Sequence, residues 1–404
     1  MAAALDRVVK SGDRVLPLIT AALEGNRGLL PSLSVQIQPA VASGSSLEAL
    51  EILRLYSRAG FSDSALALAA AVAVRREVRT LSPSDLVGAC VSFSKHKTHV
   101  PNLFDEILRH LEISSFSPKS KLSLFEAFVH LRIENKFPGQ LQPRVEEFND
   151  KSGLIRLSYV NCLPVEANVN LVVEAVEKFA NLPISAEDLK PLEHIQLMQI
   201  RAFLRFCRRD DYSKLSKTAK DKLRALDRVT LQYPDSKQTV LSKRASEALK
   251  KLRVAHDCNA WIGPFRVDVK ERDRKIVWEL ASKERFIAST TGAPDRLAIS
   301  RFQERVLKAM GYRFVQLPYW HWQRITLKKA RVGYMKQARF QAVNDKRETK
   351  PRELSDQSID PTKFDAEAAA FDHCGETFLK LEQLRRPWSW NRHRPGDLPT
   401  IITL

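Results

Sequence analysis

The sequence predicts an α+β protein of several domains, with a solenoid of α-helical repeats, then a small α/β domain, and finally an extended C-terminal tail. Three observations predict this organisation. Apolar residues recur at helical spacing through the first half of the chain, two helices there begin alike, and apolar and polar residues alternate after residue 255. At 404 residues, the chain is also longer than one ordinary hydrophobic core requires.

The first predicted segment, residues 1–44, is expected to be helical. It carries Arg7, Lys10 and Arg14 among apolar residues, as organelle presequences do. It also carries two aspartates, which such presequences avoid. The sequence therefore leaves open whether this segment is a cleaved presequence or a retained first helix.

Residues 45–206 are predicted to form α-helical repeats. Ser82 and Ser117 can each cap a helix, and each is followed by a proline at the first helical position. A second helix is expected after each, at 100–111 and 142–148, and an offset of about 35 residues is typical of a two-helix repeat. Such repeats stack into a solenoid. The alternative is an irregular helical bundle in which two helices resemble each other by chance.

Residues 207–254 are predicted to form a basic helical region. The stretch 201–253 has sixteen Lys and Arg against six Asp and Glu, which gives +10 of the formal net charge of +18. So large an excess indicates an anionic partner, most commonly nucleic acid. A merely basic soluble protein is one alternative. An anionic membrane surface is a weaker one, because the cations are not gathered on one amphipathic helix.

The sequence does not contain the motifs that are typical of several classes of function. The sequence has no run of 18 apolar residues that would span a membrane. Its five cysteines lie more than forty residues apart and show no zinc-ligand spacing, so they are expected to be reduced thiols. There is no glycine-rich phosphate loop and no Gly-x-Ser-x-Gly motif. We therefore expect no metal, no cofactor and no small-molecule substrate, and we expect His96, His99 and His110 to be surface residues.

Residues 255–327 are predicted to form the small α/β domain. Apolar and polar residues alternate from Phe265 to Lys270, as in a half-buried strand, and 275–280 reads as the second strand of a hairpin. An amphipathic helix is expected at 297–310, where Gly311 follows as its stop, and a third strand is expected at 313–317.

Residues 328–404 are predicted to form a basic and aromatic tail. It begins with a cluster of cations, continues with a polar stretch at 349–361 and a short helix at 364–384, and ends in a segment rich in Arg, Trp and Pro. Segments of this composition are mostly disordered in isolation, so we expect the tail to become ordered only when it contacts a partner.

Four stretches of the α/β domain resemble a RAP domain, an RNA-associated module found in organelle RNA proteins and abundant in apicomplexan parasites. They are Phe-Arg-Val-Asp at 265–268, Ile-Val-Trp-Glu-Leu at 276–280, the helix at 297–307, and Gly-Tyr-Arg-Phe-Val-Gln-Leu-Pro-Tyr-Trp-His-Trp at 311–322. RAP domains typically follow helical repeats. The resemblance implies RNA binding in mitochondria, with the plastid as the alternative organelle.

The RAP fold is similar to restriction-endonuclease-like nucleases. That chemistry needs two carboxylates on neighbouring strands to hold Mg²⁺, and a Lys two residues after the second carboxylate. Asp268 and Glu279 are the candidate carboxylates, but the Lys position is Ala281, and Lys283 is only a remote substitute. The resemblance therefore implies a degenerate nuclease fold with no catalytic residues, in which Asp268 and Glu279 are vestigial.

The predicted function is non-catalytic RNA binding in the mitochondrial matrix, most specifically as a structural ribosome component that binds rRNA and contacts neighbouring subunits through its tail. A trans-acting RNA processing or stability factor and a Mg²⁺-dependent endonuclease are the alternatives. Trp320 and His321 are expected to stack on bases, whereas Trp322 can equally pack under the sheet. The candidate RNA-binding residues are Arg208, Arg209, Lys217, Lys220, Lys243, Arg244, Lys250, Lys251, Arg285, Arg301, Arg305, Trp320, His321, Lys328, Lys329, Arg385 and Arg386.

Overall fold

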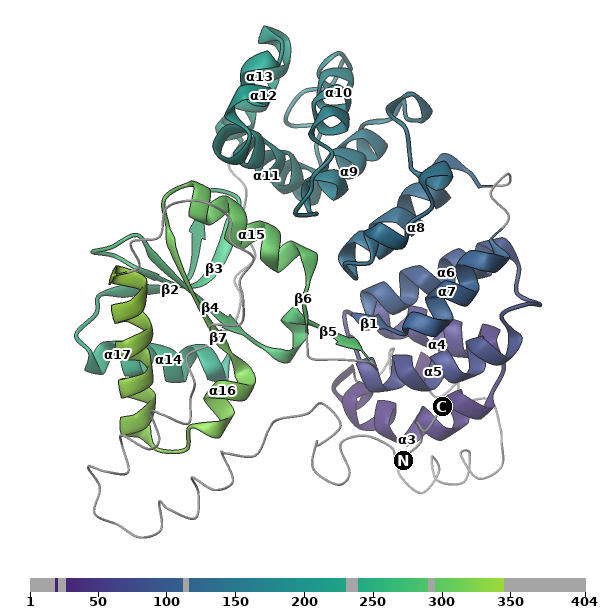
Figure 1. Ribbon diagram of the computed structural model, residues 1–404, viewed down its shortest axis with the longest axis horizontal. Helices are drawn as coiled ribbons and strands as arrows, with labels where there is room; N and C mark the ends of the chain where they lie inside the picture. The colour runs from purple at the N-terminus through teal and green to yellow at the C-terminus, as the bar shows by residue number, and fades with distance from the viewer. Residues whose placement is uncertain (1–18, 21–26, 112–115, 230–238, 290–294, 345–404) are drawn as a thin grey trace. The chain divides into compact units, whose positions relative to one another are not determined.

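The computed structural model describes residues 19–20, 27–111, 116–229, 239–289 and 295–344 (Figure 1). The chain divides into two compact units. Unit 1 contains the chain up to Phe148 together with Phe286–Ala298, and unit 2 contains Asn149–Arg285 and the described chain from Ile299 onward. Each unit has a hydrophobic core of its own.

Unit 1 is mainly helical, and alternate helices pack against one another. Helix α3 packs on α5, α4 on α6, and α6 on α8, which is the neighbour pattern of stacked helical repeats. The helices are α3 (Leu30–Ser43), α4 (Ser46–Arg58), α5 (Ser64–Glu77), α6 (Pro83–Lys95), α7 (Pro101–His110) and α8 (Pro118–His130), with 3₁₀ turns η1 (Arg27–Leu29), η3 (Glu134–Lys136), η4 (Gly139–Leu141) and η5 (Val145–Glu147).

The two similar helix starts are confirmed. The Ser82 hydroxyl accepts a hydrogen bond from the Asp85 N–H, and the Ser117 hydroxyl accepts one from the Ser120 N–H, both at 3.2 Å. The prediction of a second helix at 142–148 was wrong, because only short 3₁₀ turns form in this part of the chain. Pro143 explains the difference, since the residue before a proline is forced out of the helical region.

A late segment of the chain completes unit 1. Strand β1 (Thr98–His99) pairs in parallel with β5 (Phe286–Ser289), and β5 pairs antiparallel with β6 (Asp295–Arg296). Ile287 is buried in the core of unit 1. Local periodicity did not predict these strands, because each is at most four residues long and finds its partner far away in sequence.

The first part of unit 2 is again helical. Helix α9 packs against α10 and α11, and α13 packs against α10. Helix α11 begins where Pro191 takes the first helical position. The helices are α9 (Lys151–Cys162), α10 (Val169–Ala180), α11 (Pro191–Cys207), α12 (Arg209–Lys214) and α13 (Lys217–Ala225), followed by the 3₁₀ turn η6 (Leu226–Arg228).

The rest of unit 2 is built on a mixed sheet in the order β2-β3-β4-β7. Neighbouring strands are antiparallel from β2 to β4, and β4 and β7 are parallel. The strands are β2 (His256–Ile262), β3 (Phe265–Glu271), β4 (Ile276–Ala281) and β7 (Arg313–Pro318), and the accompanying helices are α14 (Val240–Lys251), η7 (Lys283–Arg285), α15 (Ala298–Ala309), α16 (Tyr319–Arg324) and α17 (Lys328–Asn344). The predicted α+β class is confirmed.

Two domain boundaries differ from the sequence prediction, because helices α14 and α17 both pack into the core of this sheet. Residues 240–251 of the predicted basic helical region therefore contribute to the α/β domain, and residues 328–344 of the predicted tail form a helix of that domain. On α17, the buried residues are Ala330, Tyr334, Met335 and Ala338, an apolar stripe that the surrounding charges obscured. The rest of the expected tail, residues 345–404, lies outside the described residues, and so do its short helix at 364–384 and Arg385 and Arg386.

Helix α17 is also held by a buried ion pair. Arg339 contacts both carboxylate oxygens of Glu271 at 2.9 to 3.0 Å, and the indole N–H of Trp278 donates to the same carboxylate at 3.2 Å. Glu271 and Trp278 are almost fully buried. This pairing satisfies a carboxylate that would otherwise be costly to bury.

Within the described residues, no helix is both long and apolar enough to cross a membrane.

Candidate nucleic-acid interface

The two carboxylates predicted on neighbouring strands do come together. Asp268 lies on the half-buried face of β3, where residues alternate with buried ones, and Glu279 lies on the fully buried strand β4. The Asp268 carboxylate accepts a hydrogen bond from the Leu280 N–H at 2.8 Å, which fixes it beside the end of β4. The sheet pairing thus creates one small acidic centre.

Arg285 bridges both carboxylates of this acidic centre. Its Nη1 donates to Glu279 at 2.7 Å, and its Nη2 lies 3.0 Å from each oxygen of Asp268. The Glu279 side chain is only 2% exposed, whereas those of Asp268 and Arg285 are 20% and 26% exposed. A planar guanidinium suits this task, because its fork of N–H donors matches two carboxylates at once. The centre therefore contains its own cation.

The position where a nuclease needs its lysine is filled by a small apolar residue. Ala281 is fully buried on β4, and Lys283 lies exposed on η7. Among the described residues, no group of three or more His, Cys, Asp or Glu side chains is arranged to hold a metal ion. The contacts of the acidic centre are those of a guanidinium bound by two carboxylates.

The predicted cations of the helical part lie at its surface. Arg208, Arg209 and Lys217 are exposed around α12 and the start of α13. Lys220 is half-buried, and its ammonium donates to the Ser213 carbonyl at 2.7 Å. Three of these four side chains are therefore exposed to an anionic partner.

Helix α14 carries a second group of exposed cations. One side of this helix is buried against the sheet through Ala245, Ala248 and Leu249. The basic residues lie on its exposed side, as the 3.6-residue period requires. They are Lys243, Arg244, Lys250 and Lys251. The predicted cations Lys328 and Lys329 are likewise exposed, at the start of α17.

Arg305, predicted to contact RNA, is instead a structural residue. It donates to the Cys162 carbonyl and to the Pro164 carbonyl, the latter at 2.6 Å. Its guanidinium lies 5.2 Å from the ring centre of Phe203, and burial lowers the pKa of Arg305 below its ordinary value. Its neighbour Arg301 is half-buried on the same helix. Periodicity alone could not tell which face of α15 would be covered.

The predicted aromatic platform is only partly available. His321 is 7% exposed, and its Nδ1 lies 3.3 Å from the Tyr334 hydroxyl. Trp322 is 3% exposed in the domain core, so the packing alternative is confirmed for it. Trp320 remains half-buried. Of these three aromatic residues, Trp320 is the one whose ring keeps appreciable exposure.

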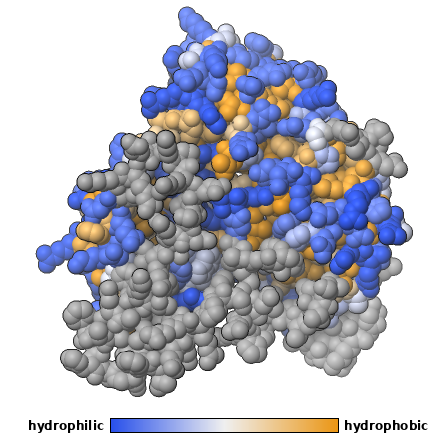
Figure 2. Space-filling view, in the orientation of Figure 1, coloured by the Kyte–Doolittle hydropathy of each residue, from blue (hydrophilic) through white to orange (hydrophobic). Residues whose placement is uncertain are grey.

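The large exposed apolar side chains are spread along the chain. In the view of Figure 2, most of the described surface is hydrophilic, and hydrophobic residues appear as separate patches. The large exposed apolar residues are Val35, Leu47, Val165, Leu192, Val240, Ile299 and Phe340. They come from seven different segments of the chain, and surface apolar residues that occur singly are ordinary.

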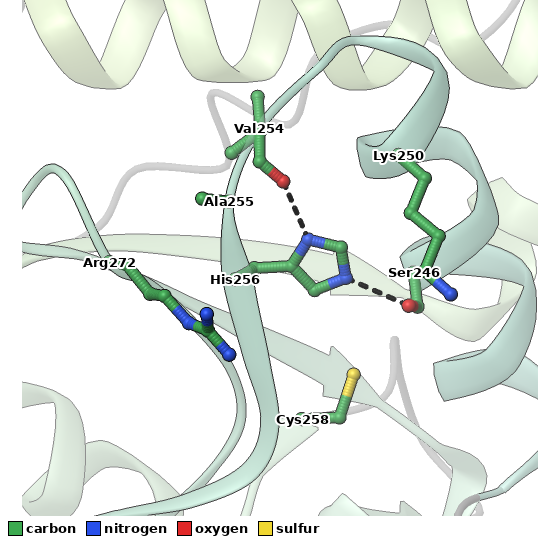
Figure 3. Close-up of a pocket in the computed structure, with 7 residues that line it drawn as sticks. All are labelled: Ser246, Lys250, Val254, Ala255, His256, Cys258 and Arg272. Carbon is green, nitrogen blue, oxygen red and sulfur yellow. Dashed lines mark hydrogen bonds between the residues drawn. The ribbon is translucent and has the colours of Figure 1, made fainter.

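Sequence reasoning missed a pocket beside α14 (Figure 3). It has a volume of about 420 Å³ and is lined by Ser246, Lys250, Val254, Ala255, His256, Cys258 and Arg272. Only Lys250 was among the predicted sites. The missed signal was the unrecognised strand β2, which brings His256 and Cys258 against α14.

The comparisons with known proteins identify one part of the chain. Residues 278–338 match the family model of the RAP domain. This match begins within β4 and ends within α17, so it includes Glu279, Arg285 and the first part of the helix that was expected to belong to the tail. No curated protein matches the chain. The chain thus carries a RAP domain preceded by a helical region, and RAP domains are generally RNA-binding domains.

Proposed function

We propose that this protein binds RNA without cleaving it. One observation carries the proposal, namely that Arg285 bridges Glu279, which like Arg285 lies within the RAP-domain match, and Asp268 on the neighbouring strand β3. A nuclease of the related fold would use such carboxylates to hold Mg²⁺, and the metal ion would help to activate a water molecule as the nucleophile. Here they neutralise a guanidinium, and Ala281 replaces the lysine that would activate water. These contacts support binding of RNA without cleavage.

The proposed RNA surface consists of the exposed cations on two parts of unit 2. They are Arg208, Arg209 and Lys217 near α12, and the four cations of α14. Contacts from Lys and Arg to phosphates supply most of the affinity of sequence-independent RNA binding. The proposal leaves out Arg285, Arg305 and His321, because each is buried or engaged within the fold.

At a finer level, we propose a structural role in the mitochondrial ribosome, with rRNA as the bound RNA. The support is the net charge of +18, the resemblance to RAP proteins of organelles, and the basic, Trp-rich C-terminal sequence. Extensions of that composition can become ordered on rRNA and on neighbouring subunits. A trans-acting RNA processing or stability factor is the alternative, and the plastid is the alternative organelle.

Gradient sedimentation of organelle lysate at moderate and high salt, combined with sequencing of crosslinked RNA, tests this finer proposal. Salt-resistant migration with a ribosomal subunit and crosslinks to rRNA are expected. A light, ribosome-free position with crosslinks to messenger or precursor RNA would overturn the ribosomal role and favour the processing factor.

The nuclease alternative has its own test. The purified protein is incubated with labelled RNA and Mg²⁺, next to an Asp268→Ala variant. We expect both proteins to leave the RNA intact. Cleavage by the wild type that is lost in the variant would contradict the non-catalytic proposal.

A further inference from the structure

The pocket between α14 and the start of β2 is a site of its own, separate from the acidic centre (Figure 3). We propose that it holds one nucleotide of a single-stranded RNA, with its phosphate between Lys250 and Arg272. The inference rests on the proposed RNA-binding function and deepens it, because it names a site and a ligand class.

The size of the pocket fits this ligand. Its volume of about 420 Å³ lies within the range of roughly 300 to 1,000 Å³ that is typical of small-molecule sites. An isolated phosphate would leave most of that space unfilled, whereas a nucleotide would use it. The cations of α14 continue along the same helix with Lys243 and Arg244, so the adjoining phosphates of the RNA would also meet positive charge.

Two cations from different elements line the pocket. Lys250 comes from the last turn of α14, and Arg272 comes from the turn after β3. Asp257 accepts hydrogen bonds from Arg272 Nε at 2.8 Å and Nη2 at 2.6 Å, which orients the guanidinium. Arg272 remains 63% exposed. Lys250, Arg272 and Asp257 together carry one net positive charge, which complements the single negative charge of a phosphodiester.

Ser246 and His256 form an ordered polar wall. The Nδ1 of His256 lies 2.8 Å from the Val254 carbonyl, so the hydrogen on this nitrogen donates to that oxygen. The Nε2 of the same ring lies 2.8 Å from the Ser246 hydroxyl, within hydrogen-bond distance. The serine oxygen keeps acceptor capacity for a ribose 2′-hydroxyl, the group that distinguishes RNA from DNA.

The remaining lining suits a base. Val254, Ala255 and Cys258 contribute apolar surface next to the polar wall. A base buries an apolar face and keeps its polar edge toward hydrogen-bonding groups. The pocket thus combines cations for the phosphate, an acceptor for the ribose and apolar atoms for the base.

Cys258 provides a direct measurement of occupancy. It is a free, half-buried thiol that lines the pocket, and Cys207 is a second half-buried free thiol outside it. The full chain is treated with iodoacetamide with and without a short single-stranded RNA, and alkylation of each cysteine is followed by mass spectrometry. We expect the RNA to slow alkylation of Cys258 several-fold. Cys207 directly precedes Arg208 and Arg209 of the proposed RNA surface, so its alkylation reports on that surface and not on the pocket.

Affinity measurements with matched variants complete the test. Lys250→Ala and Arg272→Ala each remove one charge-assisted contact, so RNA affinity should fall about tenfold. Lys336→Ala removes an exposed lysine of α17 outside the pocket and should change affinity about twofold or less. All three side chains are exposed, so the variants should fold, which circular dichroism checks.

The two levels of the proposal can fail separately. If RNA binds but Cys258 stays unprotected, and Lys250→Ala behaves like Lys336→Ala, the pocket is not the site and RNA binding stands. If the wild type binds no RNA at all, both the pocket and the proposed function are overturned.

Discussion

Arg285 is the single residue on which the acidic centre depends. Its guanidinium neutralises Glu279, whose side chain is 2% exposed, as well as Asp268. Arg285→Ala should therefore lower the free energy of unfolding by about 3 kcal/mol, because it removes a cation that contacts a buried carboxylate. Chemical denaturation measures this change.

A matched variant separates charge from packing at this centre. Adding Asp268→Asn and Glu279→Gln to Arg285→Ala removes the unpaired charges and should recover most of the lost stability. Mn²⁺ should likewise stabilise Arg285→Ala, because two freed carboxylates are suitable ligands for a hard cation. If neither the neutral variant nor Mn²⁺ has any effect, the arginine does not act as the cation of this centre.

Two histidines of unit 1 make its stability dependent on pH. His96 was expected at the surface but is 1% exposed, with Nε2 2.9 Å from the Leu53 carbonyl and Nδ1 3.0 Å from the Asp63 nitrogen, whose N–H donates to it. Burial lowers the pKa of His96. Burial, with a contribution from nearby Lys136, lowers the pKa of His99 to about 4. Both rings are therefore neutral in the fold near pH 7.

The sign of the effect follows from proton binding. Between the unfolded pKa of about 6.5 and the folded pKa of about 4, the unfolded chain binds a proton at His99 that the folded chain does not. The contribution of His99 to the free energy of unfolding is therefore fully present above about pH 6.5, and it is lost as the pH falls toward 4. His99→Phe should reduce this loss between pH 6.5 and pH 4, as measured by denaturation at several pH values. An unchanged pH dependence would contradict the assignment to His99.

At the scale of an element, helix α17 was predicted to belong to the tail, but it packs against the sheet of the α/β domain. Tyr334 and Met335 are almost fully buried against the sheet, whereas Phe340 is 61% exposed on the same helix. Met335→Ala should cost about 3 kcal/mol of unfolding free energy through loss of buried contacts. Phe340→Ala should change it by less than about 0.5 kcal/mol. Equal effects of the two variants would show that α17 is not docked as described.

At the scale of the whole molecule, the charge excess should determine how RNA affinity responds to salt. Each phosphate contact that is lost lowers the slope of log affinity against log salt by about 1. The double variant Lys243→Ala and Arg244→Ala should therefore reduce that slope by about 2. Lys336→Ala is the control, and its slope should match that of the wild type. Equal slopes for the wild type and the double variant would show that Lys243 and Arg244 of α14 do not contact RNA phosphates.

The sequence by itself determined the features that arise within a few neighbouring residues. The caps at Ser82 and Ser117, the alternating strand β3 and the helix α15 each follow from local propensity and period. The resemblance carried by 276–280 and 311–322 also identified the RAP domain, which the match to 278–338 confirmed.

Tertiary structure decided everything that depends on which distant segments meet. Arg285 reaches Asp268 across two strands, Arg305 is covered by the α9 region, and β5 completes the sheet of unit 1. The pocket likewise exists only because β2 packs beside α14. Local periodicity shows that a charged residue lies on one face of an element, but only the packing partner determines whether that face meets solvent, a counter-ion or the core.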